Sequence, residues 1–339
     1  MEYRRVGRTG LKVSEFCLGT MTFGHGCDEQ EAQRLVGTAL DAGVTFFDTA
    51  DGYSQGLSET MLGKALKGRR REAVVATKFF TPMGPGPNDS GMSRVHIMGA
   101  IEDSLRRLNT DWVDIYYMHH VDVQAPLEEM LRAVDDLVHQ GKVRYAAVSN
   151  YEAWRLCEAL WISDVRNLAR FECYQPQYSL LVRDIEHEIL PFCRDKGLGV
   201  VVWAPLAGGY LTGKYRPGQR VLEGTRSAEQ WAYPTQYFAA NADDTLAALL
   251  DVAQEMGRPA AQVALRWVLD QPGVTATIVG ARKVEQLRQN LDISGWHIPT
   301  EAMARLNQVS ELPPRYPVAM ERTMESRRNA GVKMPTLQG

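Results

Sequence analysis

The chain has 339 residues, of which 45% are hydrophobic and 23% charged, a composition typical of a folded globular protein. A formal net charge of −3 argues against nucleic acid or an anionic membrane surface as a partner. No apolar run approaches the roughly 20 residues that a membrane-spanning helix needs, and the first residues lack the apolar core of a signal peptide. The five cysteines show no zinc-type spacing. We therefore expect a cytoplasmic protein with free thiols, no metal, and no nucleic-acid or membrane partner.

Predicted strands and helices alternate along the chain. Short apolar, β-branched or aromatic runs predict eight strands, at 16–20, 44–50, 73–78, 113–119, 143–150, 173–178, 199–205 and 274–281. Amphipathic stretches predict helices at 28–42, 58–66, 93–108, 126–140, 152–161, 185–196, 243–256, 260–269 and 283–291. Among the boundary signals are the expected N-caps Asp28, Ser58 and Ser93, Pro126 at a first helical position, and Gly43, Gly141 and Gly197 just past helix ends.

This alternation predicts the fold class. Strands that alternate with helices indicate parallel βαβ units, and eight such units close into an α/β fold of the (β/α)8 TIM-barrel type. No composition break divides the chain, so we expect one domain over residues 1–339, with long loops at the C-terminal face of the barrel. The longest stretch without a clear element is 206–240, and we expect 311–339 to be an irregular tail.

The ends of the predicted strands carry residues suited to chemistry. They are Gly19 and Thr20, Asp48 followed by Tyr53, Lys78, His119 and His120, Ser149 and Asn150, Gln175, Trp203, and Gly280. Active sites of such barrels lie at these ends. Each residue alone has a structural explanation, such as a helix cap or a snorkelling lysine. An acid, a phenol, an amine and an imidazole on neighbouring strands together favour an active site.

These segments resemble the aldo-keto reductase family. The matching pieces are Gly-Thr after the first strand, DTADGY from Asp48 to Tyr53, ATK ending at Lys78, DIYYMH ending at His119, VSN ending at Asn150, and IVGARKVEQLRQN from Ile278. The resemblance extends in order from RTGLKVSEFCLGT to about Leu291. It implies an NADP(H)-dependent reductase of aldehydes or ketones, without metal or flavin.

The catalytic hypothesis rests on four residues. Reduction of a carbonyl needs a hydride donor and a proton for the developing alkoxide, and Tyr53 is the expected proton donor. An ammonium about 4 Å away favours a phenolate by roughly 4 kcal/mol at an effective dielectric of 20, or about three pKa units, which is the role expected of Lys78. Asp48 would pair with Lys78, and His119 would orient or polarise the carbonyl. The resemblance implies the same four roles.

His120 competes with His119 for the imidazole role. The family motif falls on His119, and alternation along a strand would send the two side chains in opposite directions. Ser54 is a departure, because glycine is common after the family's catalytic tyrosine.

Neutral hydrogen-bonding side chains predict the nicotinamide end of a cofactor site. Ser149, Asn150 and Gln175 suit a carboxamide, and their positions match the family's nicotinamide contacts. Trp203 offers a flat face for the ring, or is an ordinary core residue; a tryptophan here resembles the branch that includes potassium-channel β subunits. The resemblance also places Gly19, Thr20, Met21, Asp48, Ala204, Pro205, Leu206 and Gly208 against the cofactor, beneath the 206–240 loop.

Two basic segments are candidates for the cofactor phosphates. Residues 208–214 fit the GxxxxGK phosphate-loop pattern, but Tyr215 replaces the Ser or Thr that binds magnesium, which excludes a nucleoside triphosphatase. The loop and Lys214 can still contact a pyrophosphate. Arg282 and Lys283 precede a helix and suit a 2′-phosphate. Gly280 and Gln286 replace the family's lysine and arginine, so Arg282 is the expected substitute, and Gln289 and Asn290 match adenine contacts.

The substrate and the alternatives stay open at this stage. Phe23, Phe79, Phe80, His120, Tyr151 and Trp231, beside Tyr53 and His119, predict an aromatic mouth for aldehydes, quinones or aryl ketones, with a sugar ketone as a further option. One alternative function is a nicotinamide-binding regulatory subunit, since VVWAPLAGG resembles the channel-subunit branch. Another is a barrel glycosidase, but this needs two facing carboxylates and only Asp48 stands at a strand end. The oligomeric state stays open.

Overall fold

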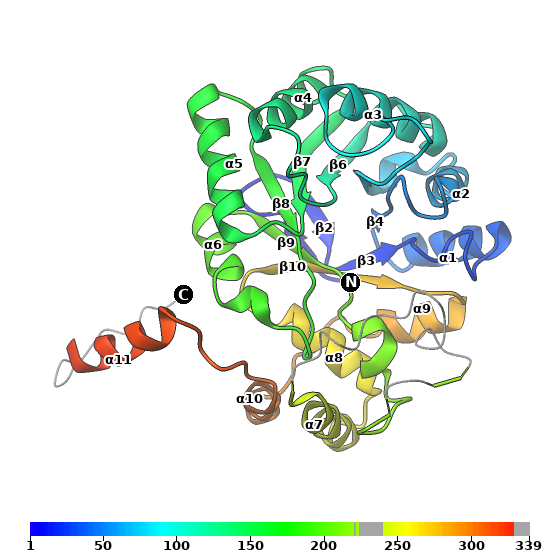
Figure 1. Cartoon of the computed structure of the whole chain (residues 1–339). Coiled ribbons are helices and arrows are strands. Elements are labelled where there is room, and N and C mark those ends of the chain that lie inside the picture. The colour runs from blue at the N-terminus through cyan, green and yellow to red at the C-terminus, as the bar shows by residue number, and fades with distance from the viewer. Residues whose placement is uncertain (220–221, 224–239, 329–339) are drawn as a thin grey trace.

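The predicted strands close into an eight-stranded parallel barrel in the computed structural model, which describes residues 1–219, 222–223 and 240–328 (Figure 1). The strands are β3 (Phe16–Gly19), β4 (Phe46–Asp48), β5 (Val74–Phe79), β6 (Val113–Met118), β7 (Val143–Ser149), β8 (Phe171–Gln175), β9 (Gly199–Val202) and β10 (Val274–Gly280). Around the barrel they follow the order β10-β3-β4-β5-β6-β7-β8-β9. The expected (β/α)8 fold is therefore confirmed. The clearest shift is in β8, which ends before Pro176, a residue without an N–H for the ladder.

Helices cover the outside of the barrel (Figure 1). They are α1 (Glu29–Asp41), α2 (Leu57–Ala65), α3 (Arg94–Leu108), α4 (Leu127–His139), α5 (Ala153–Arg166), α6 (Ile189–Lys196), α7 (Ala242–Glu255), α8 (Ala260–Leu269) and α9 (Val284–Leu291). Asp28 and Ser93 cap α1 and α3 as predicted. Ser58 is not an N-cap, because its hydroxyl donates to the Thr20 carbonyl and Gly56 caps α2. Pro126 is the N-cap of α4 rather than its first helical residue.

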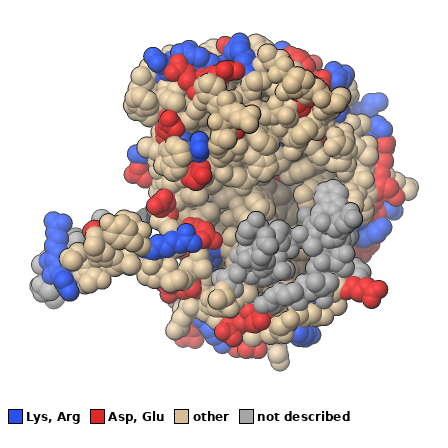
Figure 2. Space-filling model, in the orientation of Figure 1, with Lys and Arg blue, Asp and Glu red and all other residues tan. Residues whose placement is uncertain are grey.

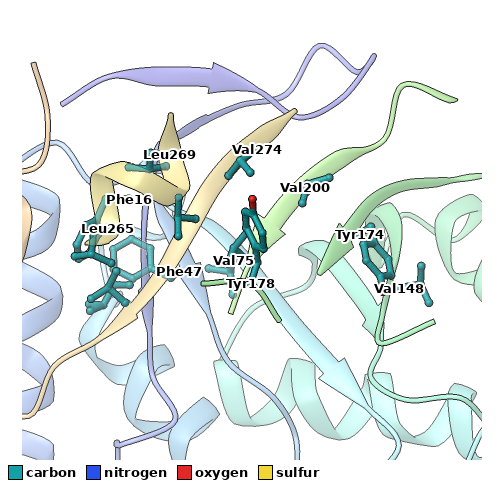
Figure 3. Packing of buried hydrophobic residues seen from close by; sticks show 14 of the residues in the cluster. Phe16, Phe47, Val75, Val148, Tyr174, Tyr178, Val200, Leu265, Leu269 and Val274 are labelled. Carbon is teal, nitrogen blue, oxygen red and sulfur yellow. The ribbon is translucent and has the colours of Figure 1, made fainter. Parts of the chain in front are cut away.

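Side-chain alternation along the strands builds two apolar layers. One set of residues faces the helices, including Phe16, Phe47, Val75, Val148, Val200 and Val274 (Figure 3). The other set fills the inside of the barrel, namely Cys17, Phe46, Ala76, Ile115, Tyr117, Ala147, Cys173, Val201 and Ala276. Because side chains repeat every second residue, the inward-facing set continues toward the strand ends as Gly19, Asp48, Lys78, Ser149 and Gln175. The polar residues of the predicted site therefore lie on top of the inner apolar layer.

Several elements were not predicted from the sequence. A hairpin of β1 (Tyr3–Arg5) and β2 (Lys12–Ser14) precedes the barrel, and Val6 and Val13 from this hairpin region pack into the inner core. After α9 come α10 (Thr300–Val309) and α11 (Val318–Arg328). The expectation of an irregular tail over 311–339 is therefore wrong at α11. That helix is rich in good helix formers, but none of its side chains with a described burial is buried, so a hydrophobic pattern could not reveal it.

The shorter helical segments are η1 (Arg70–Glu72), η2 (Asp184–Glu186) and η3 (Ala207–Thr212). The expected 206–240 loop begins with η3, and residues 220–221 and 224–239 of this stretch lie outside the described residues.

Candidate active site

The four predicted catalytic residues come together at the C-terminal end of the barrel. Asp48 is the last residue of β4, Lys78 is the penultimate residue of β5, and His119 directly follows β6. Tyr53 lies in the loop between β4 and α2. Gly19 ends the adjacent strand β3, where a Cβ would come within 2.6 Å of the Ile278 side chain on the neighbouring strand β10.

Lys78 is the centre of the cluster. Its ammonium donates hydrogen bonds to an Asp48 carboxylate oxygen, to the Thr49 carbonyl at 2.8 Å and to the Tyr53 hydroxyl at 3.2 Å. The side chain is fully buried. Burial lowers the pKa of this amine, but the Asp48 carboxylate and Tyr53 outweigh that effect and leave it raised. Lys78 therefore stays a cation whose charge is directed at the Tyr53 oxygen.

Asp48 stabilises this buried cation. One carboxylate oxygen pairs with Lys78, and the other accepts a hydrogen bond from Gln175 Nε2 at 2.8 Å. Burial raises the pKa of the Asp48 carboxyl, while Lys78 and Gln175 oppose the rise. A buried charge is costly unless it is both paired and hydrogen-bonded, and Asp48 meets both conditions. Gln175, which was predicted as a cofactor contact, is thus also part of the catalytic cluster.

His119, which follows β6, faces Tyr53 of the β4–α2 loop. The two rings meet edge to face with centroids 6.1 Å apart. Burial, followed by the nearby Lys78 and His120, holds the pKa of His119 well below its usual value. The imidazole is therefore neutral at physiological pH, which suits a hydrogen-bond donor better than a proton source. Its Nδ1 atom is buried and has no hydrogen-bond partner within the described residues.

The two histidines do not point in opposite directions as predicted. Their rings stack with centroids 4.5 Å apart and planes 22° from parallel. Strand β6 ends at Met118, so both residues follow the strand and its side-chain alternation no longer applies. His120 is the more exposed of the two and contacts the half-buried Phe80 edge to face.

The three residues expected at the nicotinamide form a connected polar chain. Ser149 Oγ donates to the Gln175 carbonyl at 2.7 Å, and Asn150 Nδ2 donates to the His119 carbonyl at 3.0 Å. Trp203 Nε1 donates to Asn150 Oδ1 at 3.2 Å. These bonds hold the ends of β6, β7, β8 and β9 together, and each amide still has hydrogen-bonding capacity left for a ligand.

Unusual backbone conformations gather at the same end of the barrel. Asn150, which follows β7, has a φ of 60°, and Ala204 and Ala207, which follow β9, have φ values of 53° and 48°. Ser54 and Gln55, directly after Tyr53, also have positive φ. Non-glycine residues adopt this region at a cost and do so most often at functional sites. Gly208 and Gly209 extend the series with φ values of 67° and 102°, so the chain after β9 turns repeatedly beside Trp203.

The β10–α9 segment carries the predicted phosphate contacts. Arg282 lies against Gly26, where an added Cβ would come within 3.1 Å of its guanidinium. Two N–H groups near the start of α9 are already bonded, Arg282 N to Gln286 Oε1 and Val284 N to Glu31 Oε1, both at 3.0 Å. These two N–H groups are therefore not available to an anion, which leaves the other N–H groups of the first turn and the side chains of Arg282 and Lys283 as candidates.

The remaining predicted contacts differ in their surroundings. Thr20 is buried, and its hydroxyl bonds to the Asp48 carbonyl and to Ser58, so it ties β3 to β4. Lys214, Gly280, Gln286 and Gln289 are exposed, and Met21, Leu206, Gly208 and Asn290 are partly exposed.

Part of the predicted aromatic mouth is not at the site. Phe79 is fully buried and stacks on Tyr116 at 4.6 Å between centroids. Phe23 is fully buried as well, and the Tyr151 hydroxyl lies among methionine sulfur atoms in the core. The sequence pattern marks all three as aromatic but does not show that they belong to the layer between strands and helices. Trp231 lies outside the described residues.

Two participants were missed in the sequence. The Thr49 carbonyl accepts from Lys78, but a backbone carbonyl has no signature in residue type. Asp51, two residues before Tyr53, is fully buried, with Oδ1 accepting from Gly52 N and Thr81 Oγ1 and with Oδ2 unpartnered within the described residues. Burial raises the pKa of this carboxyl to about 7. The only hint of Asp51 in the sequence was its place between Asp48 and Tyr53.

Comparison with known proteins identifies the family of the chain. A model of the Aldo/keto reductase family matches residues 15–311. The chain is 42% identical to the uncharacterized oxidoreductase YrpG of Bacillus subtilis (strain 168), covering 91% of this chain and 96% of that protein. It is 38% identical to a probable voltage-gated potassium channel subunit beta of Oryza sativa subsp. japonica, covering 86% and 90%, and 31% identical to the aldo-keto reductase YhdN of Bacillus subtilis, covering 95% and 97%.

The chain therefore belongs to the aldo-keto reductase family, whose members are generally NADPH-dependent oxidoreductases acting on small carbonyl compounds. Within the described ranges, no three His, Cys, Asp or Glu side chains gather as a metal site. None of the helices in that part of the chain is both long and apolar enough to cross a membrane.

Proposed function

We propose that this protein is an NADP(H)-dependent reductase of aldehydes and ketones in which Tyr53 donates a proton to the carbonyl oxygen. The observation that carries the proposal is the buried Lys78 ammonium, held by Asp48 and bonded to the Tyr53 hydroxyl at 3.2 Å. A cation at this distance stabilises negative charge on the phenol oxygen, which makes its proton easier to transfer. Asp48 in turn keeps Lys78 charged and in place.

His119 would bind the oxygen of the substrate. Because its pKa is depressed, the ring is neutral and can donate one N–H to a carbonyl without competing for the proton of Tyr53. The edge-to-face contact with Tyr53 directs both groups at the same small volume. Tyr53 then supplies the proton as charge develops on the oxygen, and Lys78 stabilises the phenolate that is left.

The surroundings suit a nicotinamide cofactor, which supplies the hydride when bound. Ser149, Asn150 and Gln175 offer neutral donors and acceptors that match a carboxamide. The turns after Trp203 present backbone N–H groups of the kind that bind pyrophosphate. Arg282 and Lys283 provide cations for a 2′-phosphate, which supports NADP(H) over NAD(H).

The substrate class follows from the neighbours of His119. His120 and Phe80 form an aromatic pair beside it with 5.2 Å between ring centroids. This pair favours apolar and aromatic carbonyl compounds over sugars, which need several hydrogen-bonding partners. Because all five cysteines are free thiols, we also propose that the protein acts in the cytoplasm.

One alternative is a regulatory subunit that binds the cofactor with little turnover. The relatives that are named channel β subunits favour it. An assay of steady-state NADPH oxidation by the intact protein separates the reductase from the regulatory subunit. The substrates are an aromatic aldehyde, a short aliphatic aldehyde, a quinone and a keto sugar. We expect multiple turnovers, fastest on the aromatic aldehyde or the quinone. Tight NADPH binding by fluorescence without turnover on any of the four would contradict the reductase and support the regulatory subunit.

A further inference from the structure

The chain leaves the barrel after α10 as an arm, residues 311–328, that ends in α11. Figures 1 and 2 show the arm projecting from the body of the molecule. Arg315 pairs with Asp184 of η2 at 2.7 Å and fixes the base of the arm. None of the α11 side chains whose burial is described is buried. A helix of 11 residues with no buried side chain among those described is marginal in water on its own, so a further surface that covers the arm would stabilise it.

The arm carries an apolar stripe. Met320 and Met324 lie four residues apart in α11, a spacing that places side chains on one face of a helix, and they are 44% and 46% exposed. Tyr316, which lies just before the helix, is 82% exposed. Arg327 and Arg328 follow the stripe at the end of the helix. The surface that covers the arm should therefore be apolar, about as long as the roughly 16 Å of an 11-residue helix, and acidic at one end.

Helix α5 has an outward face with these properties. Trp154, Trp161 and Val165 are 57%, 63% and 59% exposed, and helical geometry places them within about 40° of one another around the axis. Their stripe extends over about 16 Å. The opposite face of α5 already packs on the barrel through Leu156, Ala159, Leu160 and Ile162. A helix that is apolar on two sides is normally covered on both.

A hollow adjoins the N-terminal end of this stripe. Its volume is about 320 Å³, and its lining includes Val123, Leu127, Met130 and Trp154 together with the carboxylate of Glu158. Glu158 has no ion-pair partner within the described residues. Asp122 and Arg155 line the hollow as well, and Arg155 pairs with Glu152. The hollow thus has room for a methionine side chain between apolar residues and offers the carboxylates of Asp122 and Glu158 to an arginine.

We propose that the arm of one chain packs on α5 of a second copy, and that two chains exchange arms in a two-fold symmetric dimer. The arm points away from its own barrel (Figure 1), so its own α5 is not covered by it. A two-fold axis makes each α5 the acceptor of the other chain's arm, which satisfies both unpartnered surfaces at once. Eighteen arm residues and the face of α5 match the roughly 20 to 30 residues a side of a stable interface.

The mass of the intact protein in solution tests the proposal. Light scattering or sedimentation at micromolar concentration should give about twice 37.9 kDa. Trp161→Glu and Met324→Glu should each weaken the dimer at least tenfold. A chain that ends at Ser310 should be monomeric, should lose no more helical circular dichroism signal than α11 accounts for, and should melt at the same temperature as a wild-type monomer. Val95→Glu is the matched control, because Val95 is 70% exposed on α3 and should leave the dimer intact. A monomeric wild type, or a dimer that survives loss of the arm, would overturn the proposal.

A cross-link tests which surface receives the arm. Cys157 lies on the outer face of α5 and is the exposed member of the five cysteines, all of which are described. In Met320→Cys and Met324→Cys variants, a mild oxidant that accepts the two electrons and two protons of the paired thiols should form a disulfide to Cys157 between chains. The product should run at twice the chain mass on a non-reducing gel and vanish when Cys157→Ser is added. A cross-linked product of monomer mass, or no product from a dimeric sample, would contradict arm exchange.

Discussion

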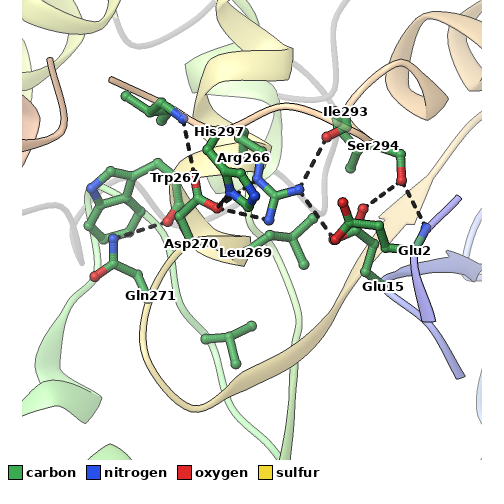
Figure 4. A network of polar contacts seen from close by, with 12 residues as sticks. Glu2, Glu15, Arg266, Trp267, Leu269, Asp270, Gln271, Ile293, Ser294 and His297 are labelled. Atoms are coloured by element: carbon green, nitrogen blue, oxygen red, sulfur yellow. Dashed lines mark hydrogen bonds and ion pairs between the residues drawn. The ribbon is translucent and has the colours of Figure 1, made fainter. Parts of the chain in front are cut away.

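Buried charges occur at both ends of the barrel, but they are satisfied to different degrees. At the N-terminal end, fully buried Glu15 accepts from Arg266 at 3.2 Å and from Ser294 at 2.6 Å (Figure 4). It also accepts from Arg4 at 2.9 Å. Arg266 Nε also donates to Asp270 at 2.9 Å, and its Nη2 lies 2.9 Å from the same oxygen without hydrogen-bond geometry. This network connects β1, β3, α8 and the chain after α9.

The C-terminal end pairs its central charge but leaves neighbouring groups unsatisfied. Lys78 and Asp48 are as buried as Arg266 and Glu15, yet His119 Nδ1 and Asp51 Oδ2 have no partner within the described residues. Stability favours complete pairing of buried groups, whereas chemistry needs groups available to a ligand. Arg266 Nη2 is the one member of the N-terminal network, among the described residues, without a hydrogen bond. The difference supports a structural role for the N-terminal network and the proposed catalytic role for the C-terminal cluster.

Breaking the N-terminal network should have the largest effect on stability. Arg266→Met keeps much of the side-chain volume but leaves Glu15 and Asp270 with a missing cation, so the free energy of unfolding should fall by about 3 to 5 kcal/mol. Denaturant melts measure the loss, and turnover of the folded protein should stay near the wild-type value. Adding Glu15→Gln should recover part of the stability. A loss of unfolding free energy below about 1 kcal/mol in Arg266→Met, or a collapse of its turnover at low temperature, would contradict a purely structural role for the N-terminal network.

At the C-terminal end of the barrel, removing the charge of the Asp51 carboxyl should raise the stability of the fold, whereas removing the Arg266 charge lowers it. The pKa of Asp51 is raised from 3.8 to about 7 by burial, so the unfolded chain loses this proton at a lower pH than the folded one. Folding stability should therefore fall as the pH rises from about 4 to 7. Asp51→Asn, which cannot ionise, should be more stable than the wild type by roughly 3 to 4 kcal/mol above pH 7 and equal to it near pH 4. The same difference at both pH values would show that the charge of Asp51 is not responsible.

The adjacent residues His119 and His120 should have different roles in the proposed active site, and single substitutions can distinguish them. His119→Ala removes the proposed donor to the carbonyl, and turnover should fall about 10²-fold or more on every substrate. His120→Ala should change Michaelis constants mainly for bulky aromatic substrates. Steady-state kinetics on three aldehydes of different size measure both. A uniform loss of turnover in the His120 variant alone would show that His120, and not His119, is the donor to the carbonyl.

A smaller effect is expected where the cofactor phosphate is proposed to bind. Arg282→Ala should weaken NADPH binding by about 1.5 to 3 kcal/mol through lost charge-assisted hydrogen bonds and leave NADH nearly unchanged. Fluorescence titration measures both affinities. Arg288→Ala is the control, since Arg288 is exposed on α9 but is not a predicted cofactor contact. Equal losses for both cofactors would give Arg282 a structural role.

The sequence predicted the parts of the fold that repeat regularly. Eight strands were found because each is a short apolar run between amphipathic helices, and the position of Asp48, Lys78 and Gln175 followed because strand ends meet at one face. The hairpin of β1 and β2 was missed because its strands have three residues each. Helix α11 was missed because it buries no stripe within its own chain.

Side-chain direction was the less predictable part of the site. Alternation assigned His119 and His120 to opposite sides, but strand β6 ends one residue too early for the rule to apply. Phe79 and Phe23 were expected at the mouth because they are aromatic and close to it in sequence, whereas both pack in the outer core. The hydrogen bond from Lys78 to the Thr49 carbonyl depends on backbone geometry that residue types do not encode.

The proton donor is the central claim, and Tyr53→Phe tests it most directly. The substitution keeps the ring and removes the hydroxyl bonded to Lys78, so turnover should fall by about 10² to 10⁴ while NADPH affinity by fluorescence titration stays near the wild-type value. Tyr151→Phe is the matched control, because its hydroxyl contacts methionine sulfur atoms in the core, and its turnover should be close to normal. Near-normal turnover of the Tyr53→Phe variant on several aldehydes would contradict the account.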